Sequence, residues 1–540
     1  MDTILFNGNF YTLDDAYNTC SALAVKNGII MRMGCDEEIL ALACENTEII
    51  DLEGKFVLPG FVDSHMHFLG VAQQADLIDL TQTKSFDEAK ALCEEKMKEI
   101  DDTSKWLFAT GFNQDYWDVK VIPTRKELDS ISCEYPIVFR RACGHISVCN
   151  TKGLEVIGIL NEKESETSYE MGFFPDGTPN GFLFETTQGL YMNAQPEPSF
   201  EDLKRMIINC AEYAVSKGIT EIHTDDFILN LEDGGKSIMS MFKYLAASGE
   251  LPVRIYQQCS LREEETLNEF LENGNCTGDD YGMYRIGPLK LMADGSLGAH
   301  TAWMRNPYLN APETCGTANM SDEKAYSLMK RAHDAGMQIA VHCIGDAALE
   351  QTLNMYRKIQ NENPRPDCRH GVVHCQIMDE RLQDRFKEDN ILAYVQPIFL
   401  KSDMNIVDDC VGTEIAKQSY NWRRFCDMGV HQSGGSDCPV EPFDILPNLQ
   451  YAVTRKNPDT GKEWYPENSV TLEEAIRMFT YEGAYASFTE NVKGTLSVGK
   501  YADMVVLDQN LFEIDPDCIR DTAVLMTMVN GKIVYSVKGI

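Results

Sequence analysis

Short apolar runs alternate with amphipathic stretches over most of this chain. Eight of the runs have the length of buried strands: 61–67, 219–224, 253–257, 287–292, 338–343, 371–375, 391–395 and 430–433. Helical periodicity lies between them, as at 200–217, 321–335 and 472–485, and such alternation is typical of βαβ units. Eight strands with helical connections predict an α/β fold, the (β/α)8 TIM barrel.

The two ends of the chain have a different pattern, with strand-like alternation at 3–12, 22–34 and 49–57 and again at 501–507 and 524–535. Asn-Gly pairs at 27–28 and 530–531 are hairpin turn signals. We therefore expect a small β-sandwich built from both termini, residues 1–58 with 490–540. The barrel is then assigned to residues 59–69 with 196–489.

The gap between the first two barrel strands is too long for one connection. Residues 70–195 are predicted to be an inserted α/β subdomain, with a helix at 86–100 opened by the capping-box pair Ser85 and Glu88. Strands are expected at 106–110 and 137–141. An insertion after the first strand of a barrel lies at the catalytic mouth, so it would act as a lid or a substrate-selecting wall.

Charge excludes some partners. The chain has 48 Lys and Arg against 84 Asp and Glu, a formal net charge of −36, which disfavours nucleic acid and anionic membrane surfaces. No basic leader opens the sequence, and no run approaches the roughly 18 apolar residues of a membrane span. We expect a cytoplasmic protein whose partner is a small-molecule substrate.

Two histidines one residue apart, His65 and His67, close the first predicted strand. Alternate residues of a strand share a face, so both imidazoles can reach one metal ion. Alone this pair is weak evidence, because a histidine commonly just bonds a backbone carbonyl. Other metal-capable residues lie at matching strand ends, where barrel enzymes assemble their sites: Lys290 in the fourth strand, His342 in the fifth, His374 in the sixth and Asp437 after the eighth. Together they predict a metal centre.

Segments 58–67, 290–298, 341–347 and 435–440, with the tail at 494–503, resemble the amidohydrolase superfamily, and within it amidohydrolase family 3, which includes hydrolases like N-substituted formamide deformylases. The resemblance implies that His65 and His67 bind the more buried ion and that His342 and His374 bind a second. It also implies that Asp437 contacts the reacting water.

Lys290 decides the type of centre. The resemblance implies that this lysine reacts with carbon dioxide to form a carbamate bridging two divalent ions, which a deprotonated, desolvated lysine can do. The alternative is an ion pair of Lys290 with Asp294, which leaves a single metal. Imidazole and oxygen ligands suit zinc, although iron, manganese, nickel or cobalt could occupy such a site.

The predicted reaction is hydrolysis of a carbon–nitrogen bond other than a peptide bond, in an N-substituted amide or formamide. A metal-activated hydroxide would attack, and Asp437 would carry the proton to the leaving group. His145 is a candidate oxyanion donor, because its segment resembles one that faces the site in the family; the alternative is a turn histidine. His300, His223 and Trp117 are candidate substrate contacts, and at His300 the family more often has a basic residue.

Two other functions stay open. One is a mononuclear-metal deaminase acting on a ring amidine, in which Lys290 would have no role. The other is a non-catalytic scaffold on the same fold, which the retention of all the ligand types argues against. The resemblance also makes a homodimer plausible.

Overall fold

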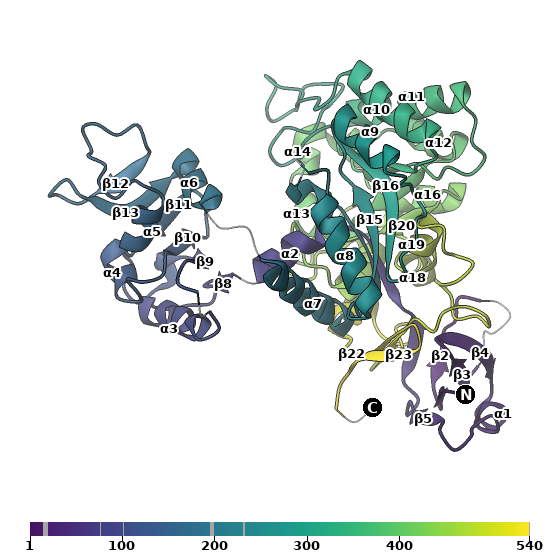
Figure 1. Ribbon diagram of the computed structural model, residues 1–540. Coiled ribbons are helices and arrows are strands. Elements are labelled where there is room, and N and C mark those ends of the chain that lie inside the picture. The colour runs from purple at the N-terminus through teal and green to yellow at the C-terminus, as the bar shows by residue number, and fades with distance from the viewer. Residues whose placement is uncertain (15–19, 76, 101, 195–198, 231–232, 539–540) are drawn as a thin grey trace. The chain divides into compact units, whose positions relative to one another are not determined.

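The computed structural model describes residues 1–540 except 15–19, 76, 101, 195–198, 231–232 and 539–540 (Figure 1). The chain forms two compact units, Met1–Val71 with Ile207–Ile540, and Ala72–Met206. The first unit contains a barrel and a pair of smaller sheets, and the second unit contains a mixed sheet with helices.

Eight parallel strands form the central sheet of the first unit, in the order β20-β19-β18-β17-β16-β15-β14-β7. Nearly every residue of these strands is buried, as expected when helices cover the outer face of a parallel sheet. The edge strands β7 and β20 approach each other, and the amide of Asp437 donates to the carbonyl of His65 at 2.8 Å. The sheet is therefore nearly closed into a barrel. Its strands are β7 (Phe61–Met66), β14 (Ile219–Thr224), β15 (Arg254–Cys259), β16 (Tyr284–Met292), β17 (Ile339–Cys343), β18 (Gly371–His374), β19 (Leu392–Val395) and β20 (Gln432–Gly434).

Helices connect these strands or follow the last of them, and they lie outside the sheet, as Figure 1 shows for α8 to α12. They are α2 (Phe68–Ala75), α7 (Phe200–Ser216), α8 (Lys236–Ser248), α9 (Glu264–Glu272), α10 (Asp322–Asp334), α11 (Asp346–Glu362), α12 (Glu380–Glu388), α13 (Leu400–Asp403), α14 (Val407–Val411), α15 (Thr413–Ala416), α16 (Trp422–Met428), α17 (Ile445–Thr454), α18 (Leu472–Met478) and α19 (Tyr481–Ala486).

The predicted (β/α)8 barrel is confirmed, since each of the eight predicted strands overlaps an observed one. The single helix predicted at 472–485 is wrong, because the chain breaks into α18 and α19. Thr480 leaves the helical region there, with φ −140° and ψ −87°, and its hydroxyl donates to the carbonyl of Ile476. A side-chain hydroxyl that competes for a backbone acceptor favours such a break.

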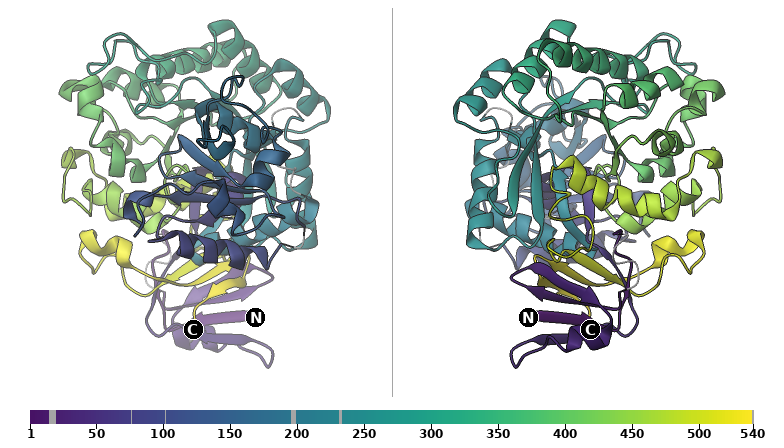
Figure 2. Two further views of the ribbon diagram at one scale, coloured as in Figure 1. Left: turned by 90° about the vertical axis from the view of Figure 1, so that its left-hand side faces the viewer. Right: turned by 90° about the vertical axis from the view of Figure 1, so that its right-hand side faces the viewer.

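Two small sheets built from both ends of the chain share one core, and in Figure 2 the purple N-terminal strands lie beside the yellow C-terminal strands in both views. Asn27 and Gly28, like Asn530 and Gly531, have positive φ, as type I′ hairpin turns require. A Cβ on Gly28 would lie 2.7 Å from the carbonyl oxygen of Asn530, so the two turns touch. The strands are β1 (Thr3–Phe6), β2 (Asn9–Phe10), β3 (Ala22–Lys26), β4 (Ile29–Gly34), β5 (Glu48–Asp51), β6 (Phe56–Pro59), β21 (Met504–Leu507), β22 (Val524–Val529) and β23 (Lys532–Ser536), with α1 (Asp36–Leu40).

These sheets and the barrel belong to one compact unit. Their separation into a sandwich domain and a barrel domain, with the boundaries given above, remains a proposal.

The second unit is a six-stranded mixed sheet in the order β12-β13-β11-β10-β9-β8. The predicted N-cap is present, since the hydroxyl of Ser85 accepts from the amide of Glu88 at 3.1 Å. The Glu88 carboxylate, however, accepts from the amide of Lys84 rather than that of Ser85. The elements are β8 (Ile78–Asp79), β9 (Leu107–Phe112), β10 (Ile137–Arg141), β11 (Ile146–Cys149), β12 (Met171–Phe173), β13 (Pro179–Phe184), α3 (Phe86–Met97), α4 (Arg125–Asp129), α5 (Thr151–Val156) and α6 (Gly189–Asn193).

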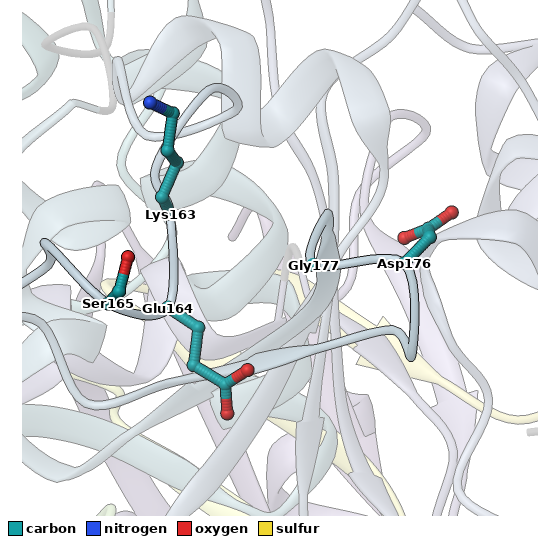
Figure 3. A pocket seen from close by; sticks show the side chains of 5 residues that line it. All are labelled: Lys163, Glu164, Ser165, Asp176 and Gly177. Atoms are coloured by element: carbon teal, nitrogen blue, oxygen red, sulfur yellow. The ribbon is translucent and has the colours of Figure 1, made fainter.

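A surface hollow of about 690 Å³ lies in this second unit. Figure 3 shows that its lining side chains do not converge on a common point. Lys163 is in an ion pair with Glu166, and Asp176 accepts from Thr178 within its own turn. No candidate site residue lines the hollow, and we assign it no function.

Among the described residues, no helix is both long and apolar enough to cross a membrane.

A buried pair of histidines ties α10 to the barrel. The amide of Ile339 donates to His370 Nδ1 at 3.0 Å, so His370 carries its proton on Nε2 and donates to His333 Nδ1 at 2.8 Å. His333 Nε2 in turn lies 2.7 Å from the carbonyl oxygen of Asn363. Burial, together with the neighbouring imidazole, holds the pKa of His370 well below its usual value, and burial lowers the pKa of His333. Both rings are therefore neutral in the folded protein.

We expect this pair to make the protein sensitive to acid. As pH falls below about 6.5, histidines of the unfolded chain take up protons that these two rings resist in the folded chain. The stability that the two neutral rings contribute is therefore fully present above that pH and is lost as the pH falls toward their lowered pKa values. The thermal midpoint of wild type should fall from pH 7.5 to pH 5 more steeply than that of His370→Gln, which lacks one of these groups. Equal slopes for the two proteins would rule out this source of acid sensitivity.

Candidate metal centre

Four histidines gather at the carboxyl ends of the barrel strands. His65 lies in β7 and His67 directly follows it, His342 lies in β17 and His374 ends β18. Ring centroids are 5.4 Å apart for His65 and His67, 5.6 Å for His65 and His374, and 4.4 Å for His342 and His374. The structure thus brings the four predicted histidines into one cluster.

Asp437, three residues after β20, completes the cluster. Its Oδ1 lies 3.3 Å from His65 Nε2 and 3.2 Å from His67 Nε2, and these ligand atoms all lie within 4.8 Å of one another. Oδ1 is buried and has no hydrogen-bond partner. A buried, unpaired carboxylate oxygen that faces two imidazole nitrogens is the donor set of a cation site.

The proton positions on the histidines agree with this interpretation. His65 Nδ1 lies 2.8 Å from Gln258 Oε1, and His374 Nδ1 lies 2.9 Å from Gln396 Oε1. An amide oxygen only accepts, so both rings carry a proton on Nδ1 and present a lone pair on Nε2. His342 is the reverse, because its Nε2 lies 3.0 Å from the carbonyl of Gly295 and its Nδ1 is left with the lone pair.

Burial keeps His65 and His374 in the neutral form that binds metals. It lowers the pKa of His65 and holds that of His374 well below its usual value, with help from His342. Burial opposes the charge on Asp437, but the imidazoles of His65 and His67 hold its pKa well below the usual range. Burial opposes the charge on His67, but Asp437 raises the pKa of that ring, so His67 would release a proton when a divalent cation binds.

Lys290, on β16, is 1 % exposed, and burial lowers its pKa. Its Nζ lies 3.9 Å from Asp225 Oδ2, a buried oxygen that has no hydrogen-bond partner. The structure places Asp225 rather than Asp294 beside Lys290, and the Asp294 carboxylate accepts from the amides of Gly345 at 2.7 Å and Trp303 at 2.9 Å. Asp225 directly follows β14, and the rule of strand ends could have found it.

The backbone around the cluster is constrained. His374 and Asp437 have φ of 80° and 57°, a region that non-glycine residues seldom occupy and that recurs at functional sites. Asp63 links the two edge strands, since its carboxylate accepts from the hydroxyl of Ser436 at 2.5 Å and from the amide of His65 at 3.2 Å. Burial raises the pKa of Asp63 to about 7. Asp63 shares a strand face with His65, which was a signal that sequence reasoning missed.

The two candidates of the insertion lie in the second unit. His145 precedes β11, is exposed, and places Nδ1 3.1 Å from Glu185 Oε2, which raises its pKa. Trp117 is 3 % exposed in the core of that unit, and its indole donates to Thr83. This location does not support Trp117 as a substrate wall. The role of His145 stays a prediction.

The other two substrate candidates lie in the first unit. His223, on β14, is fully buried, with Nε2 2.9 Å from Glu221 Oε1 and its ring against Tyr256. Such burial does not support a direct substrate contact for His223. His300 is half-buried in the loop after β16, with φ 54° and its ring 4.8 Å from that of Tyr308, and its role stays a prediction.

Comparison with known proteins agrees with the metal site that the histidine cluster indicates. The model of the amidohydrolase family matches residues 48–535. The putative amidohydrolase YtcJ of Bacillus subtilis is 30% identical over 539 residues, which cover 99% of this chain and 99% of that protein. N-substituted formamide deformylase of Arthrobacter pascens is 24% identical, over 100% of this chain and 99% of its own.

A solved structure is similar over most of its length. It is an uncharacterized metal-dependent hydrolase from Pyrococcus furiosus, with a TM-score of 0.76 and 26% identity over 94% of this chain and 99% of that one. The family match, the full-length relatives and the histidine cluster lead to one conclusion: this chain belongs to the amidohydrolase family of metal-dependent hydrolases.

Proposed function

We propose that this protein hydrolyses a non-peptide carbon–nitrogen bond in an N-substituted amide or formamide. The observation that carries the proposal is the convergence of His65 Nε2, His67 Nε2 and the unpaired Asp437 Oδ1 at the carboxyl end of the barrel. The full-length likeness to an N-substituted formamide deformylase supports the substrate class.

The residues that would hold metal are His65, His67, His342, His374, Asp437 and Lys290. We propose two divalent ions, zinc in the first instance, with Lys290 carboxylated. A buried lysine with a lowered pKa supports this assignment, because only the unprotonated amine reacts with carbon dioxide. When bound, divalent ions supply Lewis acidity and lower the pKa of water.

Asp437 would handle the proton. In hydrolysis, water adds to the carbonyl carbon, the carbon–nitrogen bond breaks, and the nitrogen leaves with a proton. An ionised carboxylate at the centre of the cluster can take the proton from the attacking water and give it to the leaving nitrogen. The products are a carboxylic acid, formic acid for a formamide, and an amine.

The test is a screen of zinc-loaded protein against N-formyl and N-acetyl amines, with amine release and metal content measured on the same sample. We expect release from at least one formylated amine, and we expect His67→Ala to lose both metal and activity. His431→Ala is the matched control, because His431 lies outside the cluster and bonds Glu482.

Two other results would contradict the proposal. Ammonia release from a nucleobase panel, with no amine from any amide, would make the protein a deaminase. A wild-type protein that retains no metal would favour the alternative of a non-catalytic scaffold on the same fold.

A further inference from the structure

Two buried glutamines contact the histidine cluster from behind. Gln258 lies on β15 and Gln396 follows β19, and the two are 1 % and 3 % exposed. Each turns its amide oxygen to the Nδ1 of one histidine, Gln258 to His65 at 2.8 Å and Gln396 to His374 at 2.9 Å.

Hydrogen bonds of the amide nitrogens fix which end of each glutamine faces the histidine. Gln258 Nε2 donates to the carbonyl of Ser64 at 3.1 Å, and Gln396 Nε2 donates to the carbonyl of Tyr394 at 3.4 Å. A flipped amide would turn its oxygen toward the backbone carbonyl, where neither oxygen can donate, and the bond to that carbonyl would be lost. The oxygen must therefore face the imidazole.

This arrangement determines what the imidazoles offer. An imidazole that donates from Nδ1 keeps a lone pair on Nε2, and His65 Nε2 is the atom beside Asp437 Oδ1. Without the acceptor, the ring is free to turn or to carry its proton on Nε2. Either change takes the Nε2 lone pair away from the metal site. A carboxylate in the same place would also accept the bond, but it would add negative charge beside Asp437 and Asp225.

We propose that Gln258 and Gln396 are positioning residues of the metal centre, which select the Nε2 lone pairs of His65 and His374 through neutral amides. The proposal rests on the metal-binding part of the proposed function. It does not depend on which substrate is hydrolysed.

The experiment measures metal binding alone. Affinity for Zn²⁺ is determined by competition with a chromogenic chelator, and the visible spectrum is recorded with Co²⁺, for wild type, Gln258→Met, Gln396→Met and Gln258→Glu. Methionine keeps the length of the side chain and removes the acceptor. Gln257→Met is the matched control, since Gln257 is the adjacent buried residue of β15 and bonds the backbone carbonyls of Thr224 and Gln258 instead of a histidine.

We expect each of the two methionine variants to bind Zn²⁺ about 10–100-fold more weakly, the effect typical of a lost partner to a ligating histidine, with an altered Co²⁺ spectrum. Gln258→Glu, which keeps an acceptor, should retain the affinity to within a few-fold, and Gln257→Met should match wild type. The thermal midpoints of the metal-free proteins report whether each variant folds.

Unchanged affinity in both folded methionine variants would overturn the positioning role. So would an equal loss in Gln258→Glu, because glutamate keeps the shape and the acceptor, and the loss would then come from the missing amide donor to the Ser64 carbonyl. A wild-type protein that binds no Zn²⁺ would instead overturn the metal centre and the proposed function together.

Discussion

Replacement of Asp437 by asparagine is expected to reduce kcat/KM about 10²–10⁴-fold, the usual contribution of a positioned acid–base group. The amide has the shape of the carboxylate, and asparagine tolerates the left-handed backbone found here, φ 57°. It cannot take a proton from water at neutral pH. The measurement is kcat/KM on the amine derivative found active, together with the metal content of the same sample.

The metal content separates two explanations. Activity lost with metal retained assigns Asp437 to proton transfer, whereas loss of both shows that its oxygen is required chiefly to hold the ion. Asp427→Asn is the control, because Asp427 is an exposed residue of α16 that pairs with Arg423 and not with a histidine of the cluster. Activity of Asp437→Asn within a few-fold of wild type would contradict either role.

The barrel could be predicted because its signals are local. Each strand is a short apolar run, and the carboxyl ends of parallel strands meet at one edge, so the sequence alone predicts that residues from distant segments, such as His65 and His342, lie together. The Asn-Gly turns at 27–28 and 530–531 were readable for the same reason, since their backbone demands are set by two residues.

The sequence could not show which of several chemically similar residues lies next to a given side chain. Lys290 has Asp225 as its nearest carboxylate rather than Asp294, a choice made by the packing of β14 against its neighbours. Gln258 and Gln396 carried no signal, because buried glutamines are ordinary and only their distance to an imidazole distinguishes them. A tryptophan of a protein core and one of a substrate wall likewise have the same local pattern, and Trp117 proved to be a core residue.

Replacement of Lys493 by methionine is expected to destabilise the protein by about 3–5 kcal/mol, the cost of leaving a buried charge without its partner. Lys493 forms an ion pair with Glu221 on β14, and the side chain of each is 5 % exposed. Burial opposes the charge on Glu221, but Lys493 and His223 hold its pKa below the usual range. The carboxylate is therefore ionised, and in the variant the neutral donors His223 and Ser487 would still bond it. The guanidinium of Arg254 also interacts with Glu221, but it is paired with Asp503. The thermal midpoint of the first unfolding transition checks the loss.

The origin of the loss can be tested by removing the second charge. Breaking a buried pair costs more than deleting it, so Glu221→Gln combined with Lys493→Met should recover part of the lost midpoint. Lys324→Met is the matched control, since Lys324 pairs with Glu263 at 2.8 Å on the surface, where such pairs contribute little, and its midpoint should match wild type. If the thermal midpoint of Lys493→Met equals that of wild type, or if the midpoint of the double variant lies below that of Lys493→Met, the loss does not come from an unpaired Glu221 carboxylate.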